Sequence, residues 1–355
     1  EIASRHAPFI RPLYVTEKGR RLDVWQKTLA LFERNDMIAV VPADMIDRID
    51  LFPGVEASSQ ALRLAAKHRL PVFLVDGHGD ADAVMHAADV NRSSLHLAQA
   101  RHALDASLAV DLARRFVAGR IYNARRLIQR LRSRLASDER KARTDLDDVI
   151  GQLDRLRRSA ELNPRLSTLD EIRGVEARAA AIYWPALASL VKRGFGETGF
   201  KRTRLPPVTD FNCLLNWTSS LLRRDMDTLA QRRGLHPGFG VLHTVNDTRD
   251  ACVFDLIEEF RAPVAEALAV QLLSTGELGA SHFDRFSMEG EDAVWLVNGG
   301  STKAIRAYEA FVDKVVVNPA SGLRTTWRGM MDHQVTAYIN HVLGERTYKP
   351  YQMDF

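Results

Sequence analysis

A change in the spacing of apolar residues near Asn91 constrains the fold of this chain more than any other feature. Between Pro12 and about Asp80, short β-branched and aromatic runs separated by polar turns are typical of strands. After Asn91 the apolar residues recur with the period of a helix. We therefore expect an α+β protein, with a small β-rich, β-sandwich-like N-terminal domain over residues 8–82 and a larger all-α C-terminal domain over residues 91–355.

The expected elements are short in the first domain and long in the second. Strands are expected at residues 13–15, 22–25, 29–32, 38–41, 46–51 and 72–75. Ser58 and Ser59 can cap a helix, and residues 77–82 are expected to form a linker. Helices are expected at residues 93–104, 107–135, 138–160, 168–193, 210–233, 251–274, 303–315 and 323–343. Thr168 and Glu171 have the spacing of a capping box at the start of the fourth helix.

The cysteine content and the apolar stretches exclude several classes of protein. Only Cys213 and Cys252 occur in 355 residues, which excludes a disulfide framework and a multi-cysteine metal site and favours a reducing cytoplasm. The longest apolar stretch, residues 179–191, is interrupted by Pro185 and is too short to cross a bilayer, so we expect no membrane partner. The chain opens without an initiator Met, so we expect either a domain of a longer polypeptide or a processed or trimmed chain.

The helix expected at residues 107–135 is strongly basic. It carries eight arginines and no acidic residue between Arg114 and Arg134. A solvated face is the ordinary explanation, but here no Asp or Glu is present for i,i+4 compensation, which favours contact with a polyanion. A second basic cluster lies in a loop after residue 200. The side chains expected to contact nucleic-acid phosphates without reading bases, and so assigned to DNA binding by the resemblance given below, are Arg114, Arg115, Arg125, Arg126, Arg130, Lys201, Arg202 and Arg204.

Acidic residues gather on one face of the helix expected at residues 251–274. Asp255, Glu258 and Glu259 follow one another at i,i+3 and i,i+4 spacing, and His243 precedes them after a turn-rich stretch. Carboxylates together with an imidazole suit a hard divalent cation, Mn²⁺ or Mg²⁺. Each residue also has a structural explanation, because such carboxylates often pair with arginines of a neighbouring helix.

Glu176 interrupts an otherwise apolar stretch of the helix expected at residues 168–193. A carboxylate with such neighbours is unfavourable unless it meets a cation or a hydrogen-bond donor. Glu176 is therefore a candidate for a buried functional carboxylate, and a Glu that faces the solvent is the alternative.

Three segments occur together in a specific order along the chain. They are residues 172–176 with Tyr183 and Trp184, residues 234–243, and residues 255–261. In this order and spacing they resemble the CRISPR-associated (Cas) adaptation integrase family, the endonucleases that insert new spacers into CRISPR arrays. Flanking matches, including residues 13–16 and 348–351, extend the resemblance over nearly the whole chain.

The resemblance implies a β domain that mediates homodimerisation and a helical domain with one Mg²⁺ or Mn²⁺ site. The metal ligands and catalytic residues carry over to Glu176, His243 and Glu258, and Asp255 would be a carboxylate just outside the direct ligands. The implied reaction is a transesterification that joins the 3′-hydroxyl of a short DNA, the spacer precursor, to the repeat array. The same site would cleave DNA with water as the nucleophile.

The resemblance also implies partners. They are double-stranded DNA, a second copy of the chain, and a small ferredoxin-like CRISPR-associated protein that bridges two dimers. Some members are joined to a reverse transcriptase, so the integrase portion of such a fusion, or an associated reverse transcriptase, is a further expectation. Two alternative functions stay open: a general metal-dependent nuclease of DNA repair, and a DNA-binding scaffold without catalysis whose acidic cluster is structural.

Overall fold

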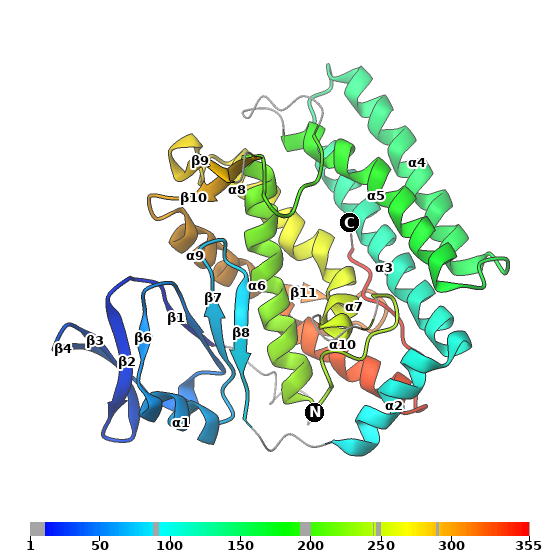
Figure 1. The fold of residues 1–355 in the computed structure, drawn as a ribbon. Coiled ribbons are helices and arrows are strands. Elements are labelled where there is room, and N and C mark those ends of the chain that lie inside the picture. The colour runs from blue at the N-terminus through cyan, green and yellow to red at the C-terminus, as the bar shows by residue number, and fades with distance from the viewer. Residues whose placement is uncertain are drawn as a thin grey trace. The chain divides into compact units, whose positions relative to one another are not determined.

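The structure is a computed structural model that describes residues 11–87, 92–191, 200–243, 245, 250–288 and 291–354. The chain divides into two compact units, Glu1–Asn91 and Arg92–Phe355 (Figure 1). The first is built mainly of strands and the second mainly of helices, so the expected α+β class is confirmed. Residues 8–10 and 91 of the expected domains and residues 192–193 of an expected helix lie outside the described residues.

The first unit contains two four-stranded sheets within its described residues. One has the order β1-β5-β7-β8, in which β8 is antiparallel to β7 and the other neighbours are parallel, and the second has the order β4-β3-β2-β6. Both sheets share one core with helix α1 (Ser59–Lys67). The strands are β1 Pro12–Val15, β2 Arg20–Trp25, β3 Thr28–Glu33, β4 Asp36–Val41, β5 Arg48–Leu51, β6 Glu56–Ala57, β7 Val72–Val75 and β8 Ala81–Met85.

The expectation of a linker over residues 77–82 is wrong. The carboxylate of Asp76 accepts hydrogen bonds from the backbone N–H groups of His78 and Asp80, both at 2.8 Å, and so closes a tight turn. Strand β8 follows this turn directly and pairs with β7. The polar, glycine-containing stretch is therefore the turn of a hairpin.

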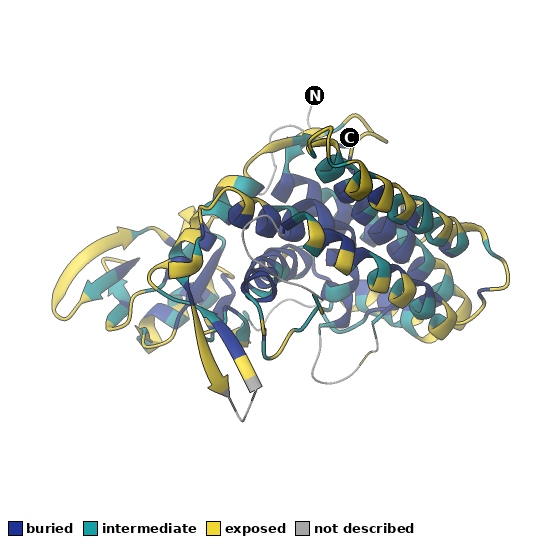
Figure 2. Cartoon of the chain, turned by 90° about the horizontal axis from the view of Figure 1, so that it is seen from above, coloured by how far each residue is buried: buried dark blue, intermediate teal, exposed yellow. Residues whose placement is uncertain are grey.

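The second unit is a bundle of long helices that agree with the expected ones to within a few residues. Helix α6 is buried along most of its length, because α7, α8, α9 and α10 pack around it. Figure 2 shows the buried positions inside the unit and the exposed ones on the outer helix faces. No helix among the described residues is both long and apolar enough to span a bilayer. The helices are α2 Ser93–Leu104, α3 Ala106–Ser133, α4 Arg140–Leu162, α5 Leu169–Val191, α6 Asp210–Arg232, α7 Ala251–Phe260, α8 Ala267–Ser274, α9 Gly300–Val312 and α10 Trp327–Val342.

Two features of the second unit differ from the expected all-helical pattern. Its described residues also form two hairpins, β9 (Phe283–Met288) with β10 (Glu291–Leu296), and β11 (Val315–Val317) with β12 (Arg324–Thr326). The helix expected at residues 251–274 is divided by a π-helical turn, η2 (Arg261–Glu266), which contains a proline. Proline cannot donate the backbone hydrogen bond that a regular helix requires, so a wider turn is favoured there.

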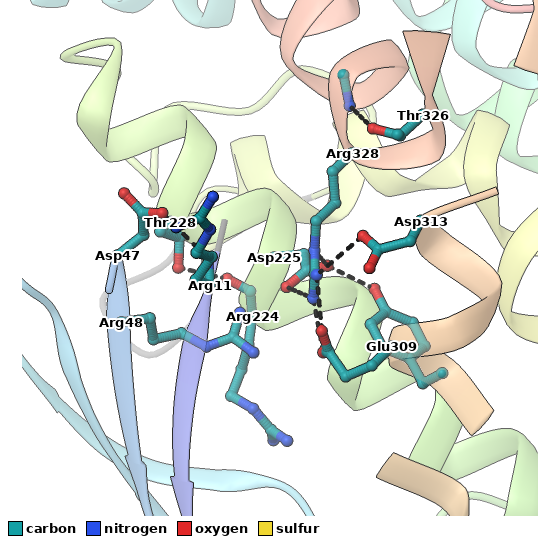
Figure 3. Close-up of polar contacts among 12 residues, drawn as sticks. Arg11, Asp47, Arg48, Arg224, Asp225, Thr228, Glu309, Asp313, Thr326 and Arg328 are labelled. Atoms are coloured by element: carbon teal, nitrogen blue, oxygen red, sulfur yellow. Dashed lines mark hydrogen bonds and ion pairs between the residues drawn. The ribbon is translucent and has the colours of Figure 1, made fainter. Parts of the chain in front are cut away.

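A buried ion cluster joins three helices of the second unit (Figure 3). Arg328, at the start of α10, donates to Asp225 of α6 at 2.8 Å and to both carboxylate oxygens of Glu309 on α9 at 2.7 and 2.6 Å. Tyr308 also donates to Asp225, at 2.9 Å. The side chains of Arg328 and Asp225 are 3% and 0% exposed. The cluster therefore holds α9 and α10 against the central helix.

The last described residues bind α3 to α7. Glu259 of α7 accepts hydrogen bonds from the hydroxyl of Tyr348, at 2.7 Å, and from the backbone N–H of Tyr351. Asn123 of α3 donates to the carbonyl of Tyr351 and accepts from the N–H of Met353, both at 2.8 Å. The C-terminal segment therefore lies beside the two helices that carry Arg120 and Glu258.

Candidate active site

A cavity of about 200 Å³ in the second unit is lined by all three expected metal ligands. Glu176 comes from α5, Glu258 from α7, and His243 from the loop before α7. Arg120 of α3 and Arg261, the first residue of η2, line the same cavity. The fold thus brings together two carboxylates, an imidazole and two guanidinium groups from elements far apart in sequence.

Asp255 holds the loop that carries His243. Its carboxylate accepts hydrogen bonds from the backbone N–H groups of Val241, Leu242 and His243 at 2.6, 3.1 and 2.9 Å. The Nδ1 of His243 also lies 2.7 Å from this carboxylate. These contacts orient the imidazole so that Nε2 faces Glu258, at 3.8 Å from Oε1. Asp255 therefore acts on the cavity through His243.

Gly240 allows this loop to approach α7. A Cβ atom at position 240 would lie 2.5 Å from the backbone carbonyl carbon of Ala251. The backbone N–H of Cys252 donates to the carbonyl of Pro237 at 2.8 Å, which fixes the loop at the start of α7. The turn-rich sequence before His243 is thus explained by a close backbone approach that excludes side chains.

Glu258 is almost fully buried and is held by two guanidinium groups. Arg261 donates to it through Nε at 2.7 Å, and the Nε of Arg120 lies 3.5 Å from its other oxygen. Burial alone would raise the pKa of Glu258, but the charges of Arg261, His243 and Arg120 outweigh burial and lower it. Glu258 is therefore ionised at neutral pH.

The other two expected ligands have raised pKa values. Burial, followed by the negative charge of Glu258, raises the pKa of Glu176 to about 7. Burial lowers the pKa of His243, but the hydrogen bond and charge of Asp255, with the charge of Glu258, outweigh it and raise the pKa. Two carboxylates that oppose each other's ionisation beside an imidazole are groups that a bound cation stabilises.

The chemistry of this donor set fits a hard divalent cation such as Mg²⁺ or Mn²⁺. Carboxylates and an imidazole face one small cavity, and a cation would remove the repulsion between Glu176 and Glu258. In the part of the chain that is described, no three His, Cys, Asp or Glu side chains form a group that could hold an ion as they stand.

The charge of helix α3 is compensated, which contradicts the sequence-based argument for an uncompensated basic face. Arg125 lies 3.5 Å from Asp154 of α4, and Arg132 pairs with Asp147 of the same helix. The i,i+4 comparison within α3 could not show these two pairs, because Asp147 and Asp154 belong to the neighbouring helix.

Other arginines of α3 are also engaged by the protein. Arg115 pairs with Asp111 at 3.0 Å, while Arg126 and Arg130 face Asp354 near the C-terminus. Arg114 donates to three backbone carbonyls where α4 ends and the turn to α5 begins, those of Ala160, Asn163 and Leu166. These bonds favour a structural role for Arg114, whereas contact between DNA and the other arginines of α3 stays a prediction.

The second basic cluster lies beside the cavity. Arg202 donates to Asn216 of α6 at 2.7 Å, and its guanidinium lies 5.6 Å from the ring of Trp184, which lines the cavity. Arg204 lies 5.7 Å from the ring of Phe254 on α7, and Lys201 is exposed. The basic cluster at residues 201–204 therefore lies close to the candidate site.

Sequence reasoning did not identify Arg120 and Arg261 as cavity residues. Arg261 follows Glu258 at i+3 spacing, so its contact was readable from the sequence. Arg120 gave no separate signal, because it is one of eight arginines in a single helix. Only the packing of α3 against α7 distinguishes it from the others.

Comparison with known proteins agrees with this architecture. The family model described as CRISPR associated protein Cas1 matches residues 13–310. A CRISPR-associated endonuclease Cas1 of Thermus thermophilus is 29% identical over 342 residues, which cover 96% of this chain and 99% of that protein.

Two solved structures share the fold. A chain of a Cas6-RT-Cas1–Cas2 complex has a TM-score of 0.82 at 16% identity, over 98% of this chain and 37% of that chain. A casposase bound to integration product has a TM-score of 0.79 at 19% identity, over 97% of this chain and 93% of that chain. Since the family model covers well over half of its length, the chain belongs to the Cas1 family of CRISPR-associated proteins.

Proposed function

We propose that this chain is a metal-dependent DNA integrase and endonuclease of CRISPR adaptation. The observation that carries the proposal is that Glu176, His243 and Glu258 line one cavity although they are far apart in sequence. The names of the relatives support the same class of reaction, since the Thermus protein is called an endonuclease and the casposase is bound to an integration product.

The proposed reaction is a transesterification. The 3′-hydroxyl oxygen of a short DNA attacks a phosphodiester of the repeat array, so that one P–O bond forms while another breaks. The attacking hydroxyl loses a proton and the leaving 3′-oxygen gains one, and no external energy source is required. A Mg²⁺ or Mn²⁺ ion held by Glu176, His243 and Glu258 would polarise the scissile phosphate and lower the pKa of the attacking hydroxyl.

The residues of the chain supply positioning and charge. Asp255 holds His243 with Nε2 toward the cavity, where the imidazole can move a proton. Arg261 and Arg120 keep Glu258 ionised and in place. The basic cluster at residues 201–204, next to Trp184, lies where it can contact a DNA backbone that enters the cavity.

The first unit is proposed to hold two copies of the chain together. Strand β4 is the edge of its sheet, and Met37, Ile38 and Val40 on it are 42%, 44% and 41% exposed. An apolar edge strand that is left uncovered promotes association, so this edge is the proposed dimer contact. The other proposed partners are double-stranded DNA, a small ferredoxin-like CRISPR-associated protein and a reverse transcriptase, fused or associated.

A joining assay tests the proposal. The protein is incubated with a labelled short duplex and a supercoiled array plasmid, in Mn²⁺ and in EDTA, with and without the small partner. We expect label joined covalently to the plasmid in Mn²⁺ only. Alanine at Glu176, His243 or Glu258 should abolish joining, with no further loss in double variants because these residues act together.

A matched control is Glu277→Ala, which removes an exposed carboxylate beyond the end of α8. It should join DNA as the wild type does. Metal-dependent cleavage without joining would favour a repair nuclease. Equal DNA binding in EDTA with no covalent change to the DNA would favour a scaffold.

A further inference from the structure

Arg120, which lies beside Glu258, also forms a buried pair with Glu266, a residue to which the proposed reaction assigns no role. Both Nη groups of Arg120 donate to the carboxylate of Glu266, at 3.1 and 2.7 Å, in a bidentate arrangement. The hydroxyl of Tyr183 donates to the same carboxylate. The side chains of Arg120 and Glu266 are only 11% and 3% exposed. Burial of a charged pair lowers stability unless hydrogen bonds of good geometry offset the loss of hydration. Here both charged groups make such hydrogen bonds.

The π-helical turn η2 places Glu266 next to Glu258. In a regular α-helix two residues eight positions apart would point about 80° apart around the axis. The wider turn between them reduces this difference, and Arg120 contacts both carboxylates. π-turns inserted into α-helices occur frequently at functional sites.

The two Nη groups of Arg120 bind Glu266, so only its Nε faces Glu258. Its Nε lies 3.5 Å from Oε2 of Glu258, and its guanidinium carbon lies 5.1 Å from the ring centre of Tyr183. The positive charge is therefore close to a proposed metal ligand, while the strongest hydrogen bonds of the guanidinium go to Glu266. Arg261 differs, because its Nε donates directly to Glu258 at 2.7 Å.

The charged groups around the cavity carry an excess of negative charge. The carboxylates that line the cavity or pair with a charged residue of its lining are those of Glu176, Asp255, Glu258 and Glu266, and the guanidinium groups that line it are those of Arg120 and Arg261. Above the pKa of Glu176, with all of these groups ionised and His243 neutral, two negative charges remain. One divalent cation neutralises such a site, whereas without Arg120 three negative charges would remain.

We propose that Arg120 is a charge-setting, positioning residue of this site. Glu266 and Tyr183 hold its guanidinium beside Glu258, so that it reduces the negative charge of the cavity without taking the place of the cation. The inference rests on the proposed function and adds a role for three residues outside the proposed ligand set. In the reaction, the same fixed positive charge favours the negative charge that develops on the phosphate.

Two variants of the pair should change metal affinity in opposite directions. Arg120→Gln makes the cavity more negative, so Mn²⁺ should bind roughly threefold tighter or more, while joining becomes slower at saturating Mn²⁺. Glu266→Gln frees the guanidinium to compete for Glu258, so Mn²⁺ should bind at least threefold more weakly. Affinity is measured on the full chain without DNA, by electron paramagnetic resonance of free Mn²⁺, with thermal unfolding as the check on folding.

Two further variants control for packing and for charge. Arg120→Lys keeps the charge but not the bidentate bonds to Glu266, so its Mn²⁺ affinity should lie closer to wild type than that of Arg120→Gln. Arg233→Gln removes a guanidinium that pairs with Asp332 away from the cavity lining, and it should bind Mn²⁺ as wild type does. Weaker binding in both Arg120→Gln and Glu266→Gln, or no change in either, would overturn the inference.

The same titration separates this inference from the proposed function. Glu258→Ala should lose most of the Mn²⁺ affinity if the ion binds in the cavity. Unchanged affinity in that variant would contradict the proposed metal site itself. Loss in Glu258→Ala, together with same-direction changes in the two Arg120–Glu266 variants, would leave the metal site standing and remove only the role of Arg120.

Discussion

The raised pKa of Glu176 distinguishes this cavity from an ordinary buried surface. Burial and the charge of Glu258 raise its pKa to about 7. The folded chain therefore holds a carboxylate whose ionised form is unfavourable there, and such groups gather at functional sites. A carboxylate of this kind lowers the stability of the folded protein wherever it has to be ionised.

Replacing Glu176 by Gln should stabilise the metal-free protein at high pH. A carboxyl group whose pKa is raised in the folded state binds its proton more tightly there than in the unfolded chain. Stability therefore falls as the pH rises from the ordinary value of 4.5 through about 7. In EDTA at pH 8, we expect Glu176→Gln to be more stable than wild type by roughly 1–3 kcal/mol.

Urea unfolding at several pH values measures this difference. The advantage of the variant should shrink to less than half at pH 5, where wild-type Glu176 is mostly protonated. A variant that is less stable than wild type at pH 8 would show that the environment of Glu176 is not the one described.

Loss of one carboxylate from the ion cluster of Figure 3 should be severe. Asp225→Asn leaves the buried charge of Arg328 with less compensation, so we expect a loss of about 3–5 kcal/mol in unfolding free energy. Asp313→Asn is the matched control, because Asp313 lies 3.8 Å from the same guanidinium but is 67% exposed. Its effect should stay within about 0.5 kcal/mol in the same denaturation assay.

Different faces of helix α3 contact different parts of the helical unit. One face meets α4 and α5, another meets α7, and the C-terminal segment covers a third part. Its arginines are therefore distributed among helix–helix pairing, chain anchoring and the cavity. The helix that the sequence marks as strongly basic is therefore a central structural element of the fold.

Arg114→Met should lower stability and leave DNA binding nearly unchanged. Its guanidinium donates to three backbone carbonyls around the turn after α4, and methionine cannot replace these bonds. We expect a loss of roughly 2 kcal/mol on unfolding. The salt dependence of DNA binding should be unaffected, whereas Lys201→Met should reduce its slope by about 0.9 without a stability change. A reduced slope in Arg114→Met would return this arginine to the DNA-binding surface.

Gly119 should be intolerant of a methyl group although it lies within α3. A Cβ atom there would be 2.6 Å from the side chain of Pro350, which is too close, so the C-terminal segment would have to shift. Gly119→Ala should therefore cost about 1–3 kcal/mol in thermal or urea unfolding. Gly151→Ala in α4 is the control, since only the end of Arg155 is near, and it should stabilise by up to about 1 kcal/mol. Equal effects of the two changes would argue against close contact by the C-terminal segment.

At the scale of the whole molecule, the two units present different surfaces. The helical unit gathers the candidate site residues around a cavity, whereas the strand-rich unit exposes apolar side chains on the edge strand β4. An edge of this kind is normally charged or covered in a monomer. A substitution in the first unit alone should therefore abolish the proposed dimer.

Ile38→Lys should convert a dimer into a monomer in sedimentation experiments at micromolar concentration. The added charge would be buried without a partner if the edge were covered. Leu104→Lys is the control, because Leu104 is 85% exposed in the helical unit and its replacement should not change the molecular mass observed. A wild-type protein that sediments as a monomer would refute the dimer, and a dimeric Ile38→Lys protein would move the contact to another surface.

Sequence alone determined the class of the fold and the position of most helices, because hydrophobic periodicity is a local property. It also identified the capping box at Thr168 and Glu171, whose two hydrogen bonds are present at 3.0 and 3.3 Å. The hairpin after Asp76 was missed because a turn and a linker have the same composition. The short hairpins among the later helices were missed because the helical period surrounds them.

Tertiary structure alone decided which charged residues act together. The sequence placed Glu176, His243 and Glu258 in one site through family resemblance, but nothing local related Arg120 and Glu266 to it. The compensation of α3 by Asp147 and Asp154 was also invisible, since charges on a neighbouring helix cannot be paired before the packing is known. Local patterns determine elements because backbone hydrogen bonds and amphipathic spacing are short-range, whereas electrostatic partners depend on which faces the folded chain brings into contact.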